Sequence, residues 1–354
     1  RQEELDALIH RTHEAGLQVV MDFIPNHVAR SYHSDACPKG TVDLGAMDDS
    51  SQAFSPRNNF YYLPDSTLIL PLSTSSSPYE EHPARATGND CFSPRPTICD
   101  WCETVKLNYG VDYCGDGGLH ADPLPDTWVK MRDILLYWAG RGIDGFRCDM
   151  TELVPPEFWA WVIPEIKAQY PEVCFLAEIY QPHRYAGYLQ AGFDYLYDKV
   201  GGYDYLVALG KGQASTTAFT GVRDAVGALQ PQMCYFMENH DEQRLASEQV
   251  FSSPRLGFLA SAVSALSGTN PFLLYFGQEL GEQGMDEEGF SGRDGRTSIF
   301  DYWSLDKLQR LEGGAYTGAG LTPEEQRLLS PRCSLVGSRD SHRRLLRLAL
   351  HGCG

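Results

Sequence analysis

Short apolar runs that each end in an acidic residue are the feature that most constrains the fold of this chain. Three of these runs lead directly to Asp22, Asp149 and Glu178. A fourth run, residues 233–237, leads into a Glu-Asn-His-Asp segment that ends at Asp241. Apolar runs of this length between helical patterns are typical of buried parallel strands. We therefore expect the acids at the carboxyl ends of strands, where α/β barrels carry their chemistry.

The spacing of these acids follows a repeating strand–helix unit of roughly 30 residues. Asp149 and Glu178 are about one unit apart, and Glu178 and Asp241 are about two units apart. Asp22 precedes Asp149 by far more than one unit, which indicates a large insertion between those two strands. Several converging carboxylates without a nucleotide-binding fingerprint favour acid/base and nucleophilic chemistry at a glycosidic bond.

The 354 residues are sufficient for one barrel of roughly 250 residues and an insertion. Serine, proline, glycine and asparagine accumulate where the insertion is expected, which is typical of loops. We predict a first strand–helix portion of the barrel at 1–27, an inserted loop-rich domain at 28–119, the remainder of the barrel at 120–312 and a C-terminal tail of unassigned structure at 313–354.

The number of strands predicts an incomplete barrel. Besides the four runs, strand patterns lie near Tyr195 and at 272–276, which makes about six, whereas a closed barrel of this class has eight. The chain opens within a helical pattern, so we expect the first two strands to precede Arg1. The predicted fold class is therefore α/β, a (β/α)8 TIM barrel of which about six units are present.

Charge and hydropathy exclude several classes of partner. The net charge of −18 argues against binding to nucleic acid or to an anionic membrane surface, and it suits a neutral substrate. No apolar run approaches the roughly 20 residues of a membrane span.

The ten cysteines leave the cellular location open. Five of them fall in the predicted insertion, where they could be free thiols, disulfides or, through Cys99 and Cys102, zinc ligands. Disulfides would fit a secreted or periplasmic protein, which we favour slightly over a cytoplasmic one.

Four short motifs occur in order along the chain, each at the end of a predicted strand. Together they resemble the α-amylase family, glycoside hydrolase family 13, over most of residues 1–311. The motifs are Asp22-Phe23-Ile24-Pro25-Asn26-His27, Gly145-Phe146-Arg147-Cys148-Asp149, Ala177-Glu178 and Glu238-Asn239-His240-Asp241.

The resemblance implies a role for each of three carboxylates. Asp149 would be the nucleophile and Glu178 the general acid/base, while Asp241 would hold sugar hydroxyls and stabilise the transition state. The implied activity is retaining hydrolysis of α-glucosidic bonds in starch-like glucans or maltooligosaccharides, without an organic cofactor.

Further residues are implied to bind the substrate or to tune the carboxylates. We expect Arg147 to lower the pKa of Asp149, and burial at a strand end to raise that of Glu178. The implied substrate-binding residues are Asp22, His27, Arg147, His240 and Arg244.

Calcium is the one metal that the resemblance implies, with Asn26 as a ligand. The chain departs from the family here, because Thr151 and Glu152 stand where its amylases often carry Lys-His. Three alternatives stay open at this point: a transglycosylase of the same family, an α-glucosidase, and a non-catalytic sugar-binding homologue, although the last would be expected to have lost a carboxylate.

Overall fold

The fold is built on one six-stranded sheet, seen in a computed structural model that describes residues 1–34, 37–71, 79–285, 293–297 and 304–329. All neighbouring strands run parallel, and their order in space follows their order in the chain. This confirms the six predicted strands. They are β1 (Val20–Phe23), β6 (Gly145–Cys148), β7 (Cys174–Ala177), β8 (Tyr195–Tyr197), β9 (Met233–Phe236) and β10 (Phe272–Leu273).

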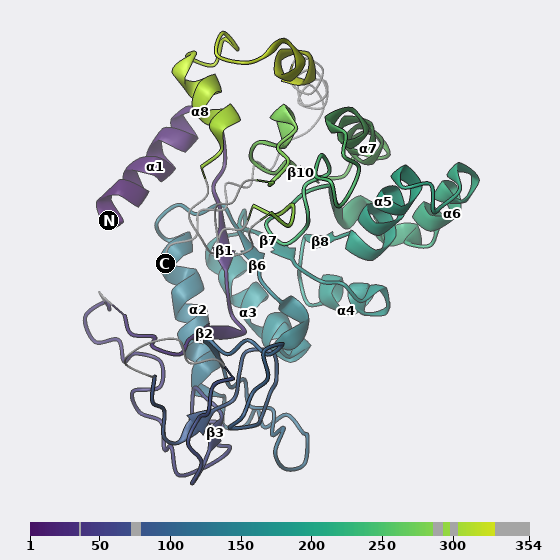
Figure 1. The fold of residues 1–354 in the computed structure, drawn as a ribbon. Helices are drawn as coiled ribbons and strands as arrows, with labels where there is room; N and C mark the ends of the chain where they lie inside the picture. The colour runs from purple at the N-terminus through teal and green to yellow at the C-terminus, as the bar shows by residue number, and fades with distance from the viewer. Residues whose placement is uncertain (35–36, 72–78, 286–292, 298–303, 330–354) are drawn as a thin grey trace.

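Helices alternate with these strands, as a (β/α) barrel requires. The sheet is curled and the helices are ranged around it, so the architecture is an incomplete (β/α) barrel (Figure 1). The labelled helices of the described residues are α1 (Gln2–Glu14), α2 (Asp126–Ala139), α3 (Pro156–Gln169), α4 (Tyr185–Gln190), α5 (Asp204–Gly210), α6 (Phe219–Asp224), α7 (Pro254–Leu266) and α8 (Asp306–Gly313).

Apolar residues at helical spacing attach the helices to the sheet. Trp128, Met131 and Leu135 lie three or four residues apart on one face of α2, and all three are buried. Burying one such side chain contributes about 1.5–3 kcal/mol. Gly142, with a φ of 93°, follows this helix and turns the chain back towards β6.

One predicted helix is broken in the structure. The pattern at 216–229 predicts a single helix, but only α6 is α-helical there, between the short 3₁₀ turns η4 (Thr216–Ala218) and η5 (Gly227–Gln232). Gly227 has a φ of 58°, and Pro231 lacks a backbone N–H, so neither residue extends a regular helix.

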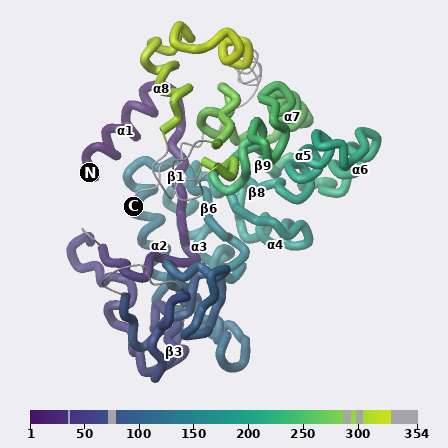
Figure 2. Tube along the Cα trace, viewed as in Figure 1, coloured from purple at the N-terminus to yellow at the C-terminus, as the bar shows by residue number. Residues whose placement is uncertain are grey.

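The inserted segment has two small antiparallel sheets of its own. β2 (His27–Ala29) pairs with β5 (Thr104–Lys106), and β3 (Tyr62–Leu63) pairs with β4 (Ala84–Arg85). The segment extends from the carboxyl end of β1 (Figure 2). Val105 belongs to the same apolar core as the barrel strands, so the insertion packs against the barrel.

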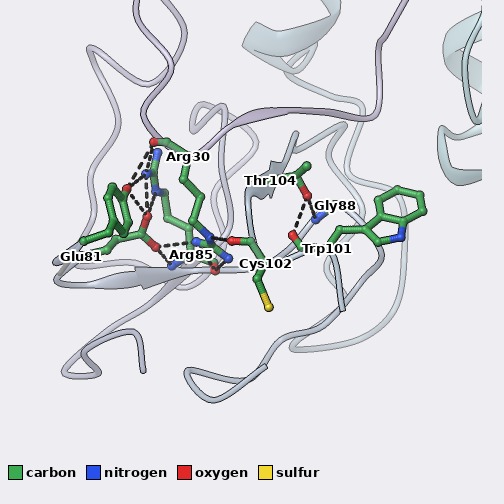
Figure 3. A network of polar contacts seen from close by, with 8 residues as sticks. Arg30, Glu81, Arg85, Gly88, Trp101, Cys102 and Thr104 are labelled. Atoms are coloured by element: carbon green, nitrogen blue, oxygen red, sulfur yellow. Dashed lines mark hydrogen bonds and ion pairs between the residues drawn. The ribbon is translucent and has the colours of Figure 1, made fainter. Parts of the chain in front are cut away.

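A buried carboxylate joins the loops of the insertion (Figure 3). The Glu81 Oε1 atom lies 2.7 Å from Arg30 Nη1, and Glu81 Oε2 lies 2.6 Å from Arg85 Nη2. Arg30 Nε also donates to the carbonyl of Cys102 at 2.5 Å. These charge-assisted contacts fix a segment that has little regular secondary structure.

Eight of the ten cysteines and the start of the predicted tail lie in the described part of the chain. The eight described cysteines are free thiols, so the free-thiol alternative is the one found among them. A secreted or periplasmic location stays a prediction.

None of the described helices combines the length and apolar character needed to cross a bilayer. Of the predicted tail, residues 323–329 are helical, and 330–354 lie outside the described residues.

Candidate active site

Strand register brings the predicted catalytic residues to one face of the sheet. Asp22 of β1 is paired directly with Arg147 of β6. On the other side of β6, the last pair is Cys148–Ala177, so Asp149 and Glu178 follow at the same level. Adjacent strands lie about 4.8 Å apart, and residues two positions apart share a face. The two carboxylates therefore stand side by side at the carboxyl ends of neighbouring strands.

One fully buried guanidinium contacts three carboxylates. Arg147 Nη1 donates to Asp22 Oδ1 and to Asp149 Oδ1, each at 2.9 Å. Arg147 Nη2 lies 2.8 Å from Glu178 Oε1. The Tyr197 ring faces the guanidinium, and the centre of this ring lies 5.6 Å from Arg147 Cζ. With all three carboxylates ionised this cluster would carry an excess of negative charge, and burial makes that excess costly.

Glu178 has further donors from the two segments beside it. Its Oε2 accepts the Met150 backbone N–H at 2.7 Å, and its Oε1 accepts the Tyr180 hydroxyl at 2.6 Å. The side chain of Glu178 is only 2% exposed. These contacts fix the carboxyl in position.

The pKa directions of the two carboxyls are the reverse of the expectation. Burial raises the pKa of Asp149 to about 8; Arg147 opposes this rise, while the charges of Glu178 and Asp22 add to it. Burial also acts to raise the pKa of Glu178, but Arg147, Met150 and Tyr180 outweigh it and lower the pKa. Each expected influence is present, but in both groups the opposing influences are larger, so the net pKa shifts are opposite to those expected. The reason is that Glu178 receives several donors, whereas Asp149 shares Nη1 with Asp22.

The segment after β9 brings Asp241 and His240 to the same cluster. Burial raises the pKa of Asp241 to about 6, and the negative charge of Glu178 adds to the rise. Burial lowers the pKa of His240 to about 4, and Arg147 contributes. The His240 Nε2 atom lies 3.2 Å from Asp241 Oδ2. At neutral pH His240 is thus an uncharged imidazole beside a carboxylate.

His27 reaches the cluster from the side of the insertion. Burial lowers its pKa to about 4; the charge of Lys106 also lowers it, and that of Glu178 opposes this change. The His27 ring lies 5.3 Å from that of Trp101, which the insertion supplies. The insertion therefore contributes directly to one wall of the site.

Arg244, which we expected to bind the substrate, makes several contacts within the protein. Its guanidinium is fully buried and pairs with Glu238 Oε2 at 2.8 Å. It also donates to Thr297 Oγ1 at 2.7 Å and to the Phe276 carbonyl at 2.8 Å. These contacts make Arg244 a support for the loop after β9.

The sequence did not predict the contacts that three further residues make near the site. The Tyr180 hydroxyl binds Glu178. Tyr197 faces Arg147 from the end of β8. Asp198, which follows β8 as the other acids follow their strands, accepts the Gly202 N–H at 3.0 Å and caps a turn. The position of Asp198 directly after a strand could have identified it from the sequence, although its carboxylate has a structural role.

The position of Asn26 does not suit the predicted calcium ion. Its side chain is 1% exposed, and Nδ2 donates to the carbonyl of Gly88 at 2.7 Å. The other amide atom, Oδ1, accepts a hydrogen bond from Lys106 Nζ at 2.9 Å. An ammonium group therefore occupies the place where a cation would have to bind, and Asn26 is not available as a metal ligand.

A second group of possible ligands lies on the surface of the insertion. Asp112, Asp116 and His120 have ligand atoms within 4.8 Å of one another. Two of these carboxylates also hold their own loop, because Asp112 accepts the Cys114 N–H and Asp116 accepts the Gly118 N–H. This group lies outside the carboxylate cluster.

Solved structures of α-amylase-family enzymes share this fold. The debranching enzyme of Nostoc punctiforme, soaked with acarbose, matches with a TM-score of 0.63 at 17% identity, covering 96% of this chain and 62% of that chain. A cyclomaltodextrinase matches with a TM-score of 0.62 at 18% identity, covering 96% and 48%. The α-amylase of H. orenii matches with a TM-score of 0.60 at 20% identity, covering 96% and 66%.

Curated relatives match over shorter stretches, and no family model matches the chain. An α-1,4-glucan:maltose-1-phosphate maltosyltransferase of Mycolicibacterium smegmatis is 37% identical over 159 residues, which are 44% of this chain and 21% of that protein. A maltosyltransferase of the same description from Cereibacter sphaeroides is 42% identical over 57 residues, 16% and 10% of the two chains. The aligned stretches thus span at most about a fifth of these two relatives.

Proposed function

We propose that this chain carries the catalytic centre of a retaining glycosidase that cleaves α-glucosidic bonds in starch-like glucans or maltooligosaccharides. The observation that carries the proposal is the placement of Asp149 and Glu178 at one level of neighbouring strands, on the two terminal nitrogens of Arg147. The shared fold supports it, and so do the curated relatives, whose names include an α-1,4-glucan.

In the proposed reaction, Asp149 attacks the anomeric carbon and Glu178 gives its proton to the leaving glycosidic oxygen. The C–O bond to the leaving sugar breaks as the bond to Asp149 forms, which produces a glycosyl-enzyme. Glu178 then takes a proton from water, whose oxygen displaces Asp149 from the anomeric carbon. This double displacement requires carboxylates roughly 5 Å apart, which matches the spacing of adjacent strands.

The reaction requires that Glu178 is protonated once the substrate has bound. The pKa directions indicate that this proton resides on Asp149 before the substrate arrives. A glycosidic oxygen that accepts a hydrogen bond from Glu178 favours the neutral form of this carboxyl. We infer that the proton moves to Glu178 as the substrate binds, which leaves Asp149 ionised beside Arg147 and ready to attack.

The remaining residues of the cluster suit recognition of a sugar ring. His27 and His240 are neutral at pH 7 and can each donate one N–H to a hydroxyl. Asp241 can accept hydroxyl protons, and its negative charge would stabilise a positively charged oxocarbenium-like transition state. We assign Asp22 the role of a second counter-charge for Arg147.

Retention of anomeric configuration is the expected stereochemical outcome. Two displacements at one carbon, first by Asp149 and then by water, restore the configuration of the substrate. Proton NMR of maltooligosaccharide cleavage should show α-anomers first, with β-anomers appearing only as the products mutarotate. Initial β-anomers would indicate direct attack by water and would exclude Asp149 as the nucleophile.

Transfer is the second candidate function, and the curated relatives favour it because their name describes a maltosyltransferase. Hydrolysis and transfer share the glycosyl-enzyme and differ only in the acceptor. Maltoheptaose incubated with and without inorganic phosphate distinguishes them by product. Free maltose in both reactions supports the hydrolase, whereas maltose 1-phosphate formed only with phosphate supports a transferase.

A further inference from the structure

A buried ammonium group lies between the insertion and the barrel. Lys106, the last residue of β5, is 2% exposed. Its Nζ atom lies 2.5 Å from Asp90 Oδ1 and 2.9 Å from Asn26 Oδ1. It also donates to the carbonyl of Leu153 at 3.3 Å. A carboxylate, an amide and a backbone carbonyl thus all direct an oxygen at one lysine nitrogen.

These three oxygens are the kinds of ligand that calcium takes in proteins. A calcium ion requires 6–8 oxygens at 2.3–2.6 Å, and it could not share this space with Nζ. We propose that Lys106 is a built-in cation that takes the place of a metal ion here, so that this junction needs no calcium and binds none. The chain thereby differs from the calcium site that its resemblance implied.

The three oxygens come from segments that are far apart in the sequence. Asp90 lies in the insertion, Asn26 directly precedes His27, and Leu153 follows Asp149 by four residues. One cation therefore connects the insertion to the segments that carry the sugar-binding histidine and the nucleophile. A single lysine can do this because its compact charge offers three hydrogen-bond donors, one for each oxygen.

The surrounding hydrogen bonds fix the same junction from the other side. Asn26 Nδ2 donates to the carbonyl of Gly88 at 2.7 Å. The Gly88 N–H donates to Thr104 Oγ1, and this hydroxyl donates to the carbonyl of Trp101 (Figure 3). Both ends of the Asn26 amide are thus engaged by the insertion. An ion that replaced Nζ would have to displace a side chain that the fold already holds.

The first experiment uses the unaltered protein. Its melting temperature should change by less than about 1 °C between EDTA and millimolar calcium, because the cation cannot be removed by chelation. Asp112, Asp116 and His120 could bind calcium independently, so the Asp116→Asn variant is measured in parallel. A rise in melting temperature with calcium that persists in Asp116→Asn cannot come from the group of Asp112, Asp116 and His120. If the same rise is lost in Asn26→Ala, a metal ion binds at the Lys106 junction and the proposal is overturned.

Variants of the lysine provide the second experiment. Lys106→Met keeps the length of the side chain but removes its charge, and we expect its melting temperature to fall by about 5 °C or more, since buried oxygens lose their partner. The matched control is Lys211→Met, because Lys211 is exposed, and this variant should melt like the wild type. A Lys106→Met protein as stable as the control would overturn the proposal.

The Lys106→Ser variant tests whether the lysine ammonium group takes the place of a metal ion. The shorter side chain frees the oxygens of Asp90, Asn26 and Leu153, so added calcium should raise the melting temperature of this variant and not that of the wild type. Absence of such a rise in a folded Lys106→Ser protein would show that the oxygens do not form a cation site. Where a lysine variant does not fold, the first experiment decides: a calcium response of the wild type that persists in Asp116→Asn and is lost in Asn26→Ala refutes the proposal.

Discussion

Glu178→Gln should lower kcat by a factor of about 10² to 10⁴, the range attributed to one catalytic proton transfer, and Asp149→Asn should also lower kcat strongly. The loss for Asp149→Asn should be at least as large as that for Glu178→Gln, because an amide cannot form the glycosyl-enzyme. Both replacements keep the shape of the side chain, so binding of an oligosaccharide should change little. Initial rates on a maltooligosaccharide, with binding measured by calorimetry, would check both expectations.

Exposed carboxylates supply the matched controls for these variants. Asp224→Asn and Glu157→Gln make the same chemical changes at exposed positions, and they should keep the activity of the wild type. Activity of Asp149→Asn or Glu178→Gln within tenfold of wild type would refute the assigned roles. A loss of binding that matched the loss of turnover would instead point to a site for recognition alone.

The stability of Asp149→Asn should differ from that of the wild type in a pH-dependent way. The folded-state pKa of Asp149 is about 8, above the unfolded value of about 4. The folded protein therefore holds a proton that the unfolded chain releases, and stability from this group is complete below pH 4 and is lost as pH rises to 8. An asparagine side chain does not titrate, so the variant should gain melting temperature relative to wild type over this range. Parallel melting curves would contradict the raised pKa.

Arg147→Met should lower the free energy of unfolding by about 3–5 kcal/mol, as expected when one partner of a buried ion pair is removed. The guanidinium is fully buried and is the shared counter-charge of Asp22, Asp149 and Glu178. Without it, the carboxylates repel one another in a region of low polarity. Urea denaturation would measure the change, and activity should fall with it because the positions of both catalytic carboxylates depend on the same contacts.

A double variant separates the loss of charge from the loss of packing. Asp22→Asn combined with Arg147→Met removes one of the three carboxylates that have lost the guanidinium, so it should recover part of the stability lost in Arg147→Met alone. Arg255→Met, at an exposed position, serves as the control and should unfold like the wild type. If the double variant were less stable than Arg147→Met alone, charge repulsion would not be the cause of the loss.

The strands and the carboxylates could be predicted because a local pattern encodes them. An apolar run followed by an acid marks the carboxyl end of a buried strand, and Asp149 and Glu178 follow this rule, whereas Asp22 lies within β1, one residue before its end. The rule does not state what an acid does at that position. Asp198 satisfies it equally well, but its carboxylate caps a turn.

The parts that could not be predicted depend on contacts between distant segments. Lys106 reads as an ordinary residue at the end of a short strand, and only the fold places Asp90 and Asn26 around it. The order of the two pKa values depends on the donors Met150 and Tyr180, which reach Glu178 from two different loops. Arg244 matched a motif, whereas its actual contacts are with Glu238, outside the cluster.

Strand register has a consequence for how this protein can diverge. Asp22, Arg147, Asp149 and Glu178 meet because β1, β6 and β7 are aligned residue by residue. Deleting one residue within β6 would turn Arg147 and Asp149 to the opposite face together, because side chains alternate along a strand. Loops at the surface of the insertion bear no such constraint and tolerate changes of length. Descendants of this chain could therefore acquire new sugar preferences through loop insertions and deletions, while the chemistry at the strand ends stays unchanged.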